Sequence, residues 1–210
     1  MAAVIALIGD LIASKRVAQR GALQKRLEKA LTDVSNGHSG LASPYTLTLG
    51  DEFQAVYRKP DAVVADLLRI LAAIHPQRAR FALGVGPLST DINPRQALGM
   101  DGPAFHQARA GMETMKRLGT VLRVEGAKDS DWSAINHILA YVGHQMEGWG
   151  ANRLLILRSR LLGVPVATMA TELGISRVAV HKNISTAGLD HVVAICEDLT
   201  RALRTHLADA

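Results

Sequence analysis

Short runs of β-forming residues alternate with amphipathic helical segments through the first part of the chain. Residues 3–8 form a continuous apolar run, which is typical of a central strand buried on both faces. Residues 45–49 and 53–57 predict a hairpin around Gly50-Asp51-Glu52, because Gly and Asp favour a tight turn. Two further strands are predicted over residues 80–85 and 120–124.

Helical spacing fills the gaps between these strands. Ser14 has the character of a helix N-cap, and the apolar positions that follow it repeat at helical spacing until the glycines at 37 and 40. Further helices are predicted from Pro60 to Pro76 and over residues 103–117. The order is βαββαβ with one extra helix and strand, which predicts an α+β, ferredoxin-like sheet with helices on one face.

A polar stretch at residues 126–131 marks a predicted boundary between domains 1–127 and 128–210. The second part reads as helix throughout, with segments at 132–146, 150–162, 165–173, 176–185 and 189–207. Trp132 and Trp149 are expected to anchor this helical unit onto the first domain.

Composition limits the class of protein. The chain has 210 residues, a hydrophobic share of 48%, a net charge of +5 and one cysteine, Cys196, which excludes an intramolecular disulfide and predicts a cytoplasmic protein. The apolar start is too short for a signal peptide, and no run is long enough to span a membrane. Cys196 is expected to be a buried small hydrophobe.

Two acidic positions converge in the predicted sheet. Asp10 ends the first strand, and Asp51 and Glu52 lie at the tip of the hairpin that neighbours it. Paired carboxylates suit Mg²⁺ or Mn²⁺, which share their ligands with substrate phosphates. The alternative is structural: Asp10 would cap a turn, and Gly-Asp-Glu would serve only as a good hairpin turn.

Residues 165–185 have the spacing of a helix-turn-helix: Ala170 permits close crossing, Gly174 takes the turn and Val180 packs inward. The expected DNA-facing residues are Ser176, Arg177, His181, Lys182 and Asn183. From residue 151 onward the chain contains seven Lys and Arg residues and five Asp and Glu residues. This small excess of positive charge predicts that DNA binding is weak or needs a dimer. A plain helical hairpin for dimerisation remains the alternative.

The motifs G-D-L-I-A-S-K-R and L-G-D-E-F-Q-A-V resemble the core of class III nucleotidyl cyclases, which are related in fold to diguanylate cyclases and the polymerase palm. The resemblance implies metal ligands at Asp10 and Asp51, with the Leu11 carbonyl as a further ligand, and implies a bound nucleoside triphosphate. Glu52 matches no metal ligand in most of that family. The tail resembles the helix-turn-helix of sigma-factor region four.

The resemblance to nucleotidyl cyclases also implies a motif before the third helix in which a Gly precedes an Asn and an Arg, and the matching stretch here is G-P-A-F-H-Q-A-R-A, which begins at Gly102. His106 stands where the Asn is expected, and Arg109 comes one residue early, which turns its side chain by about 100° on a helix. The implied nucleotide-binding residues are Leu11, Ser14, Lys15, Arg16, His106 and Arg109. Over nearly its full length the chain is similar to the SatD family, on G-D-L-I-x-S, T-L-G-D-E-F-Q and D-G-P-A-F-H-Q-A-R.

These expectations define three hypotheses. The first is a dimeric regulator of transcription that binds nucleotide and metal in the front domain and DNA through the tail. The second is an active nucleotidyl cyclase or polymerase-like enzyme that uses two metal ions, with the tail as a targeting or dimerisation scaffold. The third is a structural module in which both sites are vestigial.

Overall fold

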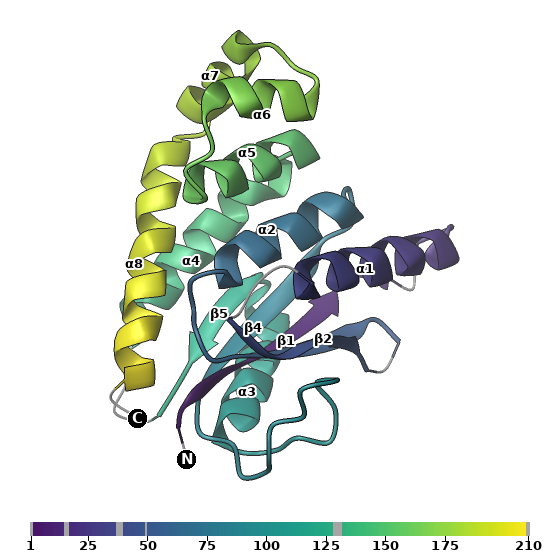
Figure 1. Cartoon of the computed structure of the whole chain (residues 1–210), viewed down its shortest axis with the longest axis vertical. Coiled ribbons are helices and arrows are strands. Elements are labelled where there is room, and N and C mark those ends of the chain that lie inside the picture. The colour runs from purple at the N-terminus through teal and green to yellow at the C-terminus, as the bar shows by residue number, and fades with distance from the viewer. Residues whose placement is uncertain (1, 15–16, 37–39, 49, 128–131, 209–210) are drawn as a thin grey trace.

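A five-stranded mixed sheet is the centre of the molecule, with helices on both of its faces and a helical part extending from one of them (Figure 1). The computed structural model describes residues 2–14, 17–36, 40–48, 50–127 and 132–208. The strands are β1 (Val4–Leu11), β2 (Leu41–Leu47), β3 (Glu52–Tyr57), β4 (Ala79–Gly86) and β5 (Leu122–Glu125). The α-helices are α1 (Arg20–Ser35), α2 (Val63–Ile74), α3 (Pro103–Leu118), α4 (Ser133–Gln145), α5 (Ala151–Leu161), α6 (Val166–Leu173), α7 (Arg177–Thr186) and α8 (Leu189–Ala208).

The strand order is β2-β3-β1-β4-β5. Neighbouring strands are antiparallel except β4 and β5, which are parallel. β1 therefore lies in the middle of the sheet, as its continuous apolar run predicts. Every strand and helix predicted from the sequence is present, most of them within a few residues of the expected ends.

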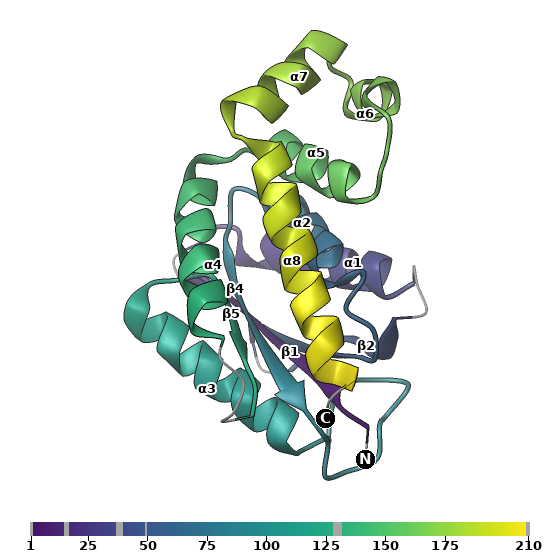
Figure 2. The same cartoon turned by 90° about the vertical axis from the view of Figure 1, so that its left-hand side faces the viewer.

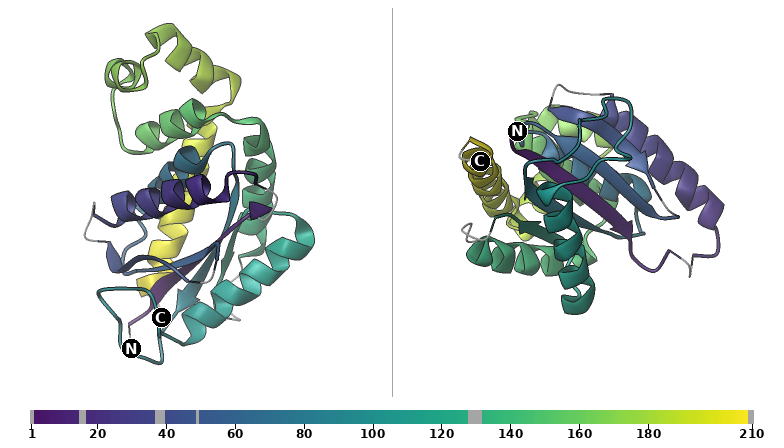
Figure 3. Two further views of the ribbon diagram at one scale, coloured as in Figure 1. Left: turned by 90° about the vertical axis from the view of Figure 1, so that its right-hand side faces the viewer. Right: turned by 90° about the horizontal axis from the view of Figure 1, so that it is seen from below.

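The two faces of the sheet carry different helices (Figure 3). Ile5 and Leu7 of β1 pack into the cluster that includes α1 and α2, whereas Val4, Ala6 and Ile8 pack into the cluster that includes α3. The prediction of helices on one face is right for α1 and α2 and wrong for α3. The apolar run of β1 is buried on both sides because α3 covers the second side.

Close packing of α3 on the sheet depends on a glycine in β4. A Cβ atom at Gly84 would lie 1.9 Å from the carbonyl oxygen of Ala104 and 2.5 Å from the backbone nitrogen of Ala108. The backbone of α3 therefore rests directly on β4, at a distance that only glycine allows.

Ser14 does not cap a helix. α1 begins at Arg20, with Gln19 at its N-cap position and no side-chain cap. Ser14 is buried, and its hydroxyl donates a hydrogen bond to the carboxylate of Asp51. The N-cap prediction is wrong because the hydroxyl is bonded to the hairpin instead of to the start of the helix.

The helical part lies against the sheet domain (Figure 2), and the two share a hydrophobic core. α5 packs along α2, and α8 runs from the end of α7 down to the sheet. Trp132 and Trp149 are buried in this core, as expected. Near its C-terminal end α8 is held by stacking of His206 on Trp132, with 4.3 Å between ring centroids, and by an ion pair between Arg204 and Asp61 at 2.5 Å. The predicted boundary at residues 127 and 128 falls between β5 and α4 and stays a prediction.

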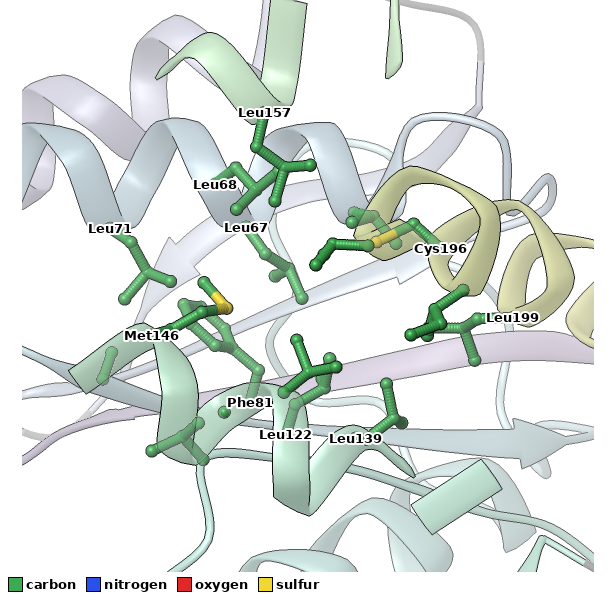
Figure 4. Close-up of a pocket in the computed structure, with 17 residues that line it drawn as sticks. Leu67, Leu68, Leu71, Phe81, Leu122, Leu139, Met146, Leu157, Cys196 and Leu199 are labelled. Atoms are coloured by element: carbon green, nitrogen blue, oxygen red, sulfur yellow. The ribbon is translucent and has the colours of Figure 1, made fainter. Parts of the chain in front are cut away.

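An apolar cavity of about 60 Å³ lies where α2, β4, β5, α4, α5 and α8 meet (Figure 4). Cys196 is one of its lining residues, and burial raises the pKa of the Cys196 thiol to about 12. The thiol is therefore inert at neutral pH, in agreement with the prediction of a small hydrophobe.

Among the helices that the structure describes, none is long and apolar enough to cross a membrane.

A buried polar chain links the hairpin to α2. The hydroxyl of Tyr57 lies 2.7 Å from the hydroxyl of Tyr45 and 2.6 Å from Oδ2 of Asp66. Burial raises the pKa of both tyrosines well above the ordinary value, so both remain protonated. The protonated hydroxyl of Tyr57 can donate to Asp66, which is itself buried.

Candidate functional site

Asp10 is the next-to-last residue of β1 and lies on the face that α3 covers. In the sheet it is paired with Glu52 of β3 on one side and Arg80 of β4 on the other. Lys116, from the last turns of α3, approaches over the sheet, with Nζ 3.6 Å from Oδ2 of Asp10. Nη1 of Arg80 lies 4.0 Å from the same oxygen. A carboxyl group is therefore held between two cations.

The surroundings of Asp10 act on its charge in opposite directions. Burial raises the pKa of Asp10 above its ordinary value, and the nearby carboxylates of Asp51 and Glu52 act in the same direction. Lys116 and Arg80 oppose this effect. The carboxylate is therefore poorly hydrated and depends on neighbouring positive charge.

Asp51 lies in the turn that joins β2 to β3. Its backbone oxygen accepts a hydrogen bond from the N–H of Leu11 at 3.3 Å, and its carboxylate accepts one from the hydroxyl of Ser14. Gly50 has a φ of 70°, which lets the chain reverse before Asp51. The turn is thus fixed against the end of β1, and the predicted proximity of Asp10 and Asp51 is observed.

Glu52 begins β3 and is not part of the turn tip. It is half-buried, and its Oε1 lies 3.3 Å from Nε2 of Gln54 and 3.4 Å from Oγ1 of Thr48. The N–H of Thr48 donates to the backbone oxygen of Glu52 at 2.9 Å and closes the turn. Glu52 is therefore a third carboxylate beside Asp10, with hydrogen bonds of its own.

These donors fit a divalent cation that arrives with a phosphate ligand. Carboxylate oxygens suit Mg²⁺ and Mn²⁺, which commonly take only one or two carboxylates and complete their shell with phosphate and water. Within the described residues no group of three or more His, Cys, Asp or Glu side chains could hold a metal ion by itself. Asp10 and Asp51 are the carboxylates that could contribute to such a shell.

Arg80 is a second cation beside Asp10. Its side chain is 18% exposed, and its Nη1 lies 4.0 Å from Oδ2 of Asp10. A phosphate oxygen is a suitable acceptor for a guanidinium group.

The remaining predicted nucleotide residues are distributed differently. Leu11 and Ser14 lie beside Asp51, whereas Lys15 and Arg16 lie outside the described residues. His106 and Arg109 are exposed on the N-terminal half of α3, and Nε2 of His106 lies 2.9 Å from Oδ1 of Asp101. Arg109 precedes Lys116 by two turns, about 10 Å along the helix axis. The structure does not bring His106 and Arg109 to the carboxylates of the same chain.

Sequence reasoning missed Arg80 and Lys116. Arg80 could have been found from the antiparallel pairing of β1 with β4, which sets it opposite Asp10. Lys116 carried no such signal, because its approach depends on α3 lying on the second face of the sheet.

In the helical part, α6 and α7 are joined by a short turn. Gly174 ends α6 in the left-handed conformation, and the hydroxyl of Ser176 caps α7 by accepting from the N–H of Ala179 at 3.1 Å. Val180 is fully buried. The exposed residues of α7 include Arg177, Val178, His181 and Lys182. Four of the five residues predicted to face DNA, Ser176, Arg177, His181 and Lys182, are therefore exposed.

Asn183 differs from the prediction. It is half-buried, and its Oδ1 accepts a hydrogen bond from Nε of Arg153 in α5 at 3.1 Å, while its amide donates to the backbone oxygen of Ala179 at 2.9 Å. The expected outward orientation of Asn183 is wrong, because α5 supplies a donor on the inner side of α7.

Comparison with known proteins places the chain in a family. No curated protein matches it. The SatD family matches residues 4–161, from the start of β1 to the end of α5. The match is shorter than the nearly full length expected, since the helix-turn-helix candidate and α8 lie outside it. It nevertheless covers the sheet, the acidic site and the first helices of the tail, and the chain therefore belongs to the SatD family.

Proposed function

We propose that this chain is a nucleotide- and metal-binding, DNA-binding regulator of transcription that acts in the cytoplasm as a homodimer. The observation that carries the proposal is the grouping of Asp10 and Asp51 beside two cations, Arg80 and Lys116. Acidic ligands for a metal and basic ligands for phosphates are the two halves of a nucleoside triphosphate site.

Each residue has a defined task in this proposal. Asp10 and Asp51 would hold Mg²⁺ or Mn²⁺, with the Leu11 carbonyl as a further ligand. When bound, the ion neutralises phosphate charge and lowers the pKa of a coordinated hydroxyl. Lys116 and Arg80, which pair with Asp10, would turn to the phosphates. Ser14 keeps Asp51 in position through its hydroxyl.

The strand order supports a ferredoxin-like, cyclase-like interpretation of the sheet. Through the βαββαβ part, β1 lies between β3 and β4, and β2 is at the edge. All neighbouring pairs in that part are antiparallel, as the ferredoxin-like pattern requires. Asp10, near the C-terminal end of β1, and the β2–β3 turn then lie at the same end of the strands, which is the arrangement that the cyclase resemblance implies.

DNA binding is assigned to α7, with α6 and α5 as its support. The cap at Ser176, the left-handed Gly174 and the buried Val180 are features of a helix-turn-helix. Arg177 and Lys182 supply exposed positive charge for phosphates and guanine edges. α8 connects this unit to the sheet, and we propose that nucleotide occupancy changes the spacing of two recognition helices in a dimer.

A second candidate function is an active nucleotidyl cyclase or polymerase-like enzyme. The adjacent carboxylates Asp10 and Asp51 favour it, because two-metal phosphoryl transfer needs such a pair. The separation of His106 and Arg109 from those carboxylates within one chain favours the regulator instead. An enzyme would need these residues from a second copy.

Incubation of the purified chain with each nucleoside triphosphate and Mn²⁺ or Mg²⁺, followed by chromatography with mass detection, separates the two functions. The Asp10→Asn, Asp51→Asn double variant is the test, and Asp91→Asn, an exposed acid in the loop before α3, is the matched control. A regulator retains the triphosphate unchanged and loses it in the double variant. A new nucleotide that disappears in the double variant and persists in the control would establish the enzyme.

A further inference from the structure

A groove of about 480 Å³ lies between α4, the start of α5 and the corner where α7 turns into α8. Sites for small molecules commonly have volumes of about 300–1,000 Å³. The three segments meet near the N-terminal end of α8 in Figure 2. This groove is separate from the carboxylate site, since none of its lining residues belongs to the sheet or to α3.

The groove has an aromatic wall. Tyr141 of α4 is 67% exposed, whereas the other two tyrosines, Tyr45 and Tyr57, are buried in the sheet domain. Trp149, two residues before α5, lines the same groove but is 8% exposed. The exposed ring of Tyr141 therefore offers the flat apolar surface on which a planar ligand can stack.

The guanidinium group of Arg153 is held in the groove, and some of its N–H donors make no hydrogen bond to the described residues. Nε of Arg153 donates to Asn183, and the guanidinium carbon lies 5.8 Å from the centroid of the Trp149 ring. Within the described residues this is the side chain's one hydrogen bond, so the two terminal nitrogens keep their donors for a ligand. Because Asn183 and Trp149 already fix the group, little side-chain entropy is lost on binding an anion.

The charge of the groove has one sign. Arg153 supplies positive charge, and among the residues that the structure describes the lining contains no Asp or Glu. Asp190, which is next to His191 in the first turn of α8, is turned to Arg160, with 2.7 Å between Oδ1 and Nη2. The groove therefore attracts an anion and contains no carboxylate that would repel one.

We propose that this groove binds a small planar organic anion, with its ring against Tyr141 and its carboxylate, sulfonate or phosphate group on Arg153. The ligand would act close to the recognition helix, because the arginine that receives the anion also holds Asn183 of α7. The proposal does not depend on nucleotide or DNA binding, so it can fail or succeed independently of the proposed function.

A pair of matched dyes tests both parts of the site. 8-Anilinonaphthalene-1-sulfonate carries a planar apolar body and one negative charge, and N-phenyl-1-naphthylamine is its neutral counterpart. We expect the full chain to bind the sulfonate with a stoichiometry of one and more tightly than the neutral dye. Benzoate should displace the sulfonate, and inorganic phosphate, which lacks a ring, should not.

The variants separate charge from stacking. Arg153→Gln should weaken the sulfonate dye roughly tenfold or more, the effect of losing a charge-assisted hydrogen bond, and leave the neutral dye unchanged. Tyr141→Ala, at an exposed position that folding does not need, should weaken both dyes. Arg117→Gln, exposed on α3 and outside the groove, removes the same charge and is the matched control. Equal binding of the sulfonate by the Arg153→Gln and Arg117→Gln proteins, or displacement by phosphate as effective as by benzoate, would overturn the proposal.

Discussion

Asp10 of β1 and Arg80 of β4 are cross-strand neighbours whose side chains lie on the face of the sheet that α3 covers, with 4.0 Å between Oδ2 and Nη1. Lys116 of α3 meets the same carboxylate from above the sheet at 3.6 Å. The three residues come from three separate segments, so the charged cluster is a product of the tertiary fold. Asp51, fixed to the end of β1 by Leu11 and Ser14, completes it.

The first prediction concerns the ionisation of Asp10. Lys116 is the cation that most strongly opposes the raised pKa of this carboxyl, so Lys116→Met should raise the pKa of Asp10 further. Because the pKa of Asp10 is higher in the folded than in the unfolded chain, the folded chain holds this proton more tightly. The free energy of unfolding should therefore fall as the pH rises from the ordinary pKa near 3.8 through the folded-state pKa of Asp10. Carbon-13 NMR titration of the carboxyl groups measures this pKa directly. Lys25→Met, exposed on α1, should leave it unchanged, and an Asp10 pKa that does not respond to Lys116→Met would show that the pair is not formed in solution.

The second prediction concerns the buried tyrosine chain. Tyr57→Phe removes the hydroxyl that contacts both Tyr45 and Asp66, and the buried Asp66 loses a donor. We expect the free energy of unfolding in urea to fall by about 1–3 kcal/mol, the cost of unpairing buried polar groups. Tyr141→Phe, which alters an exposed hydroxyl, should be close to neutral. A loss from Tyr57→Phe as small as that of the control would show that the chain contributes nothing.

The third prediction concerns the contact between α3 and the sheet. Gly84→Ala places a methyl group against the backbone of Ala104 and Ala108, so it should destabilise the fold by about 3 kcal/mol or more. Gly21→Ala meets no atom within 4 Å and lies in the first turn of α1, so it should be neutral or stabilise by about 0.5–1 kcal/mol. Thermal unfolding of both variants tests the difference. Similar melting temperatures would mean that α3 does not rest on β4 at this position.

The elements and their order could be predicted from the sequence because they follow from local patterns of apolar residues and turn formers. The proximity of Asp10 and Asp51 also followed, since strand order sets which ends meet. The position of α3 was not predicted, although the continuous apolar run of β1 indicates that both faces of the sheet are covered. Lys116 depends on that position, and Asn183 depends on Arg153, which is thirty residues away along the chain. Contacts of this kind are set by packing between elements, which residue spacing does not reveal.

The fourth prediction concerns the recognition helix. Arg177→Ala with Lys182→Ala removes two exposed cations from α7 and should abolish DNA binding in a fluorescence-anisotropy titration at low salt, with nucleotide affinity unchanged. The control pair, Lys25→Ala with Arg58→Ala, changes the net charge equally but lies on α1 and after β3. Equal DNA affinity of the two double variants would favour a dimerisation role for α6 and α7.

The central claim is that Asp10 and Asp51 hold a metal-bound nucleoside triphosphate, and calorimetric titration tests it most directly. Each non-hydrolysable triphosphate analogue is titrated into the chain with Mn²⁺ and, separately, with a chelator. The proposal predicts binding of at least one analogue that requires Mn²⁺, is lost in Asp51→Asn and is kept in Asp91→Asn, with the melting temperature of Asp51→Asn close to that of the unaltered chain. Binding by Asp51→Asn that equals the control, or binding that is indifferent to Mn²⁺, would contradict the assignment of this site.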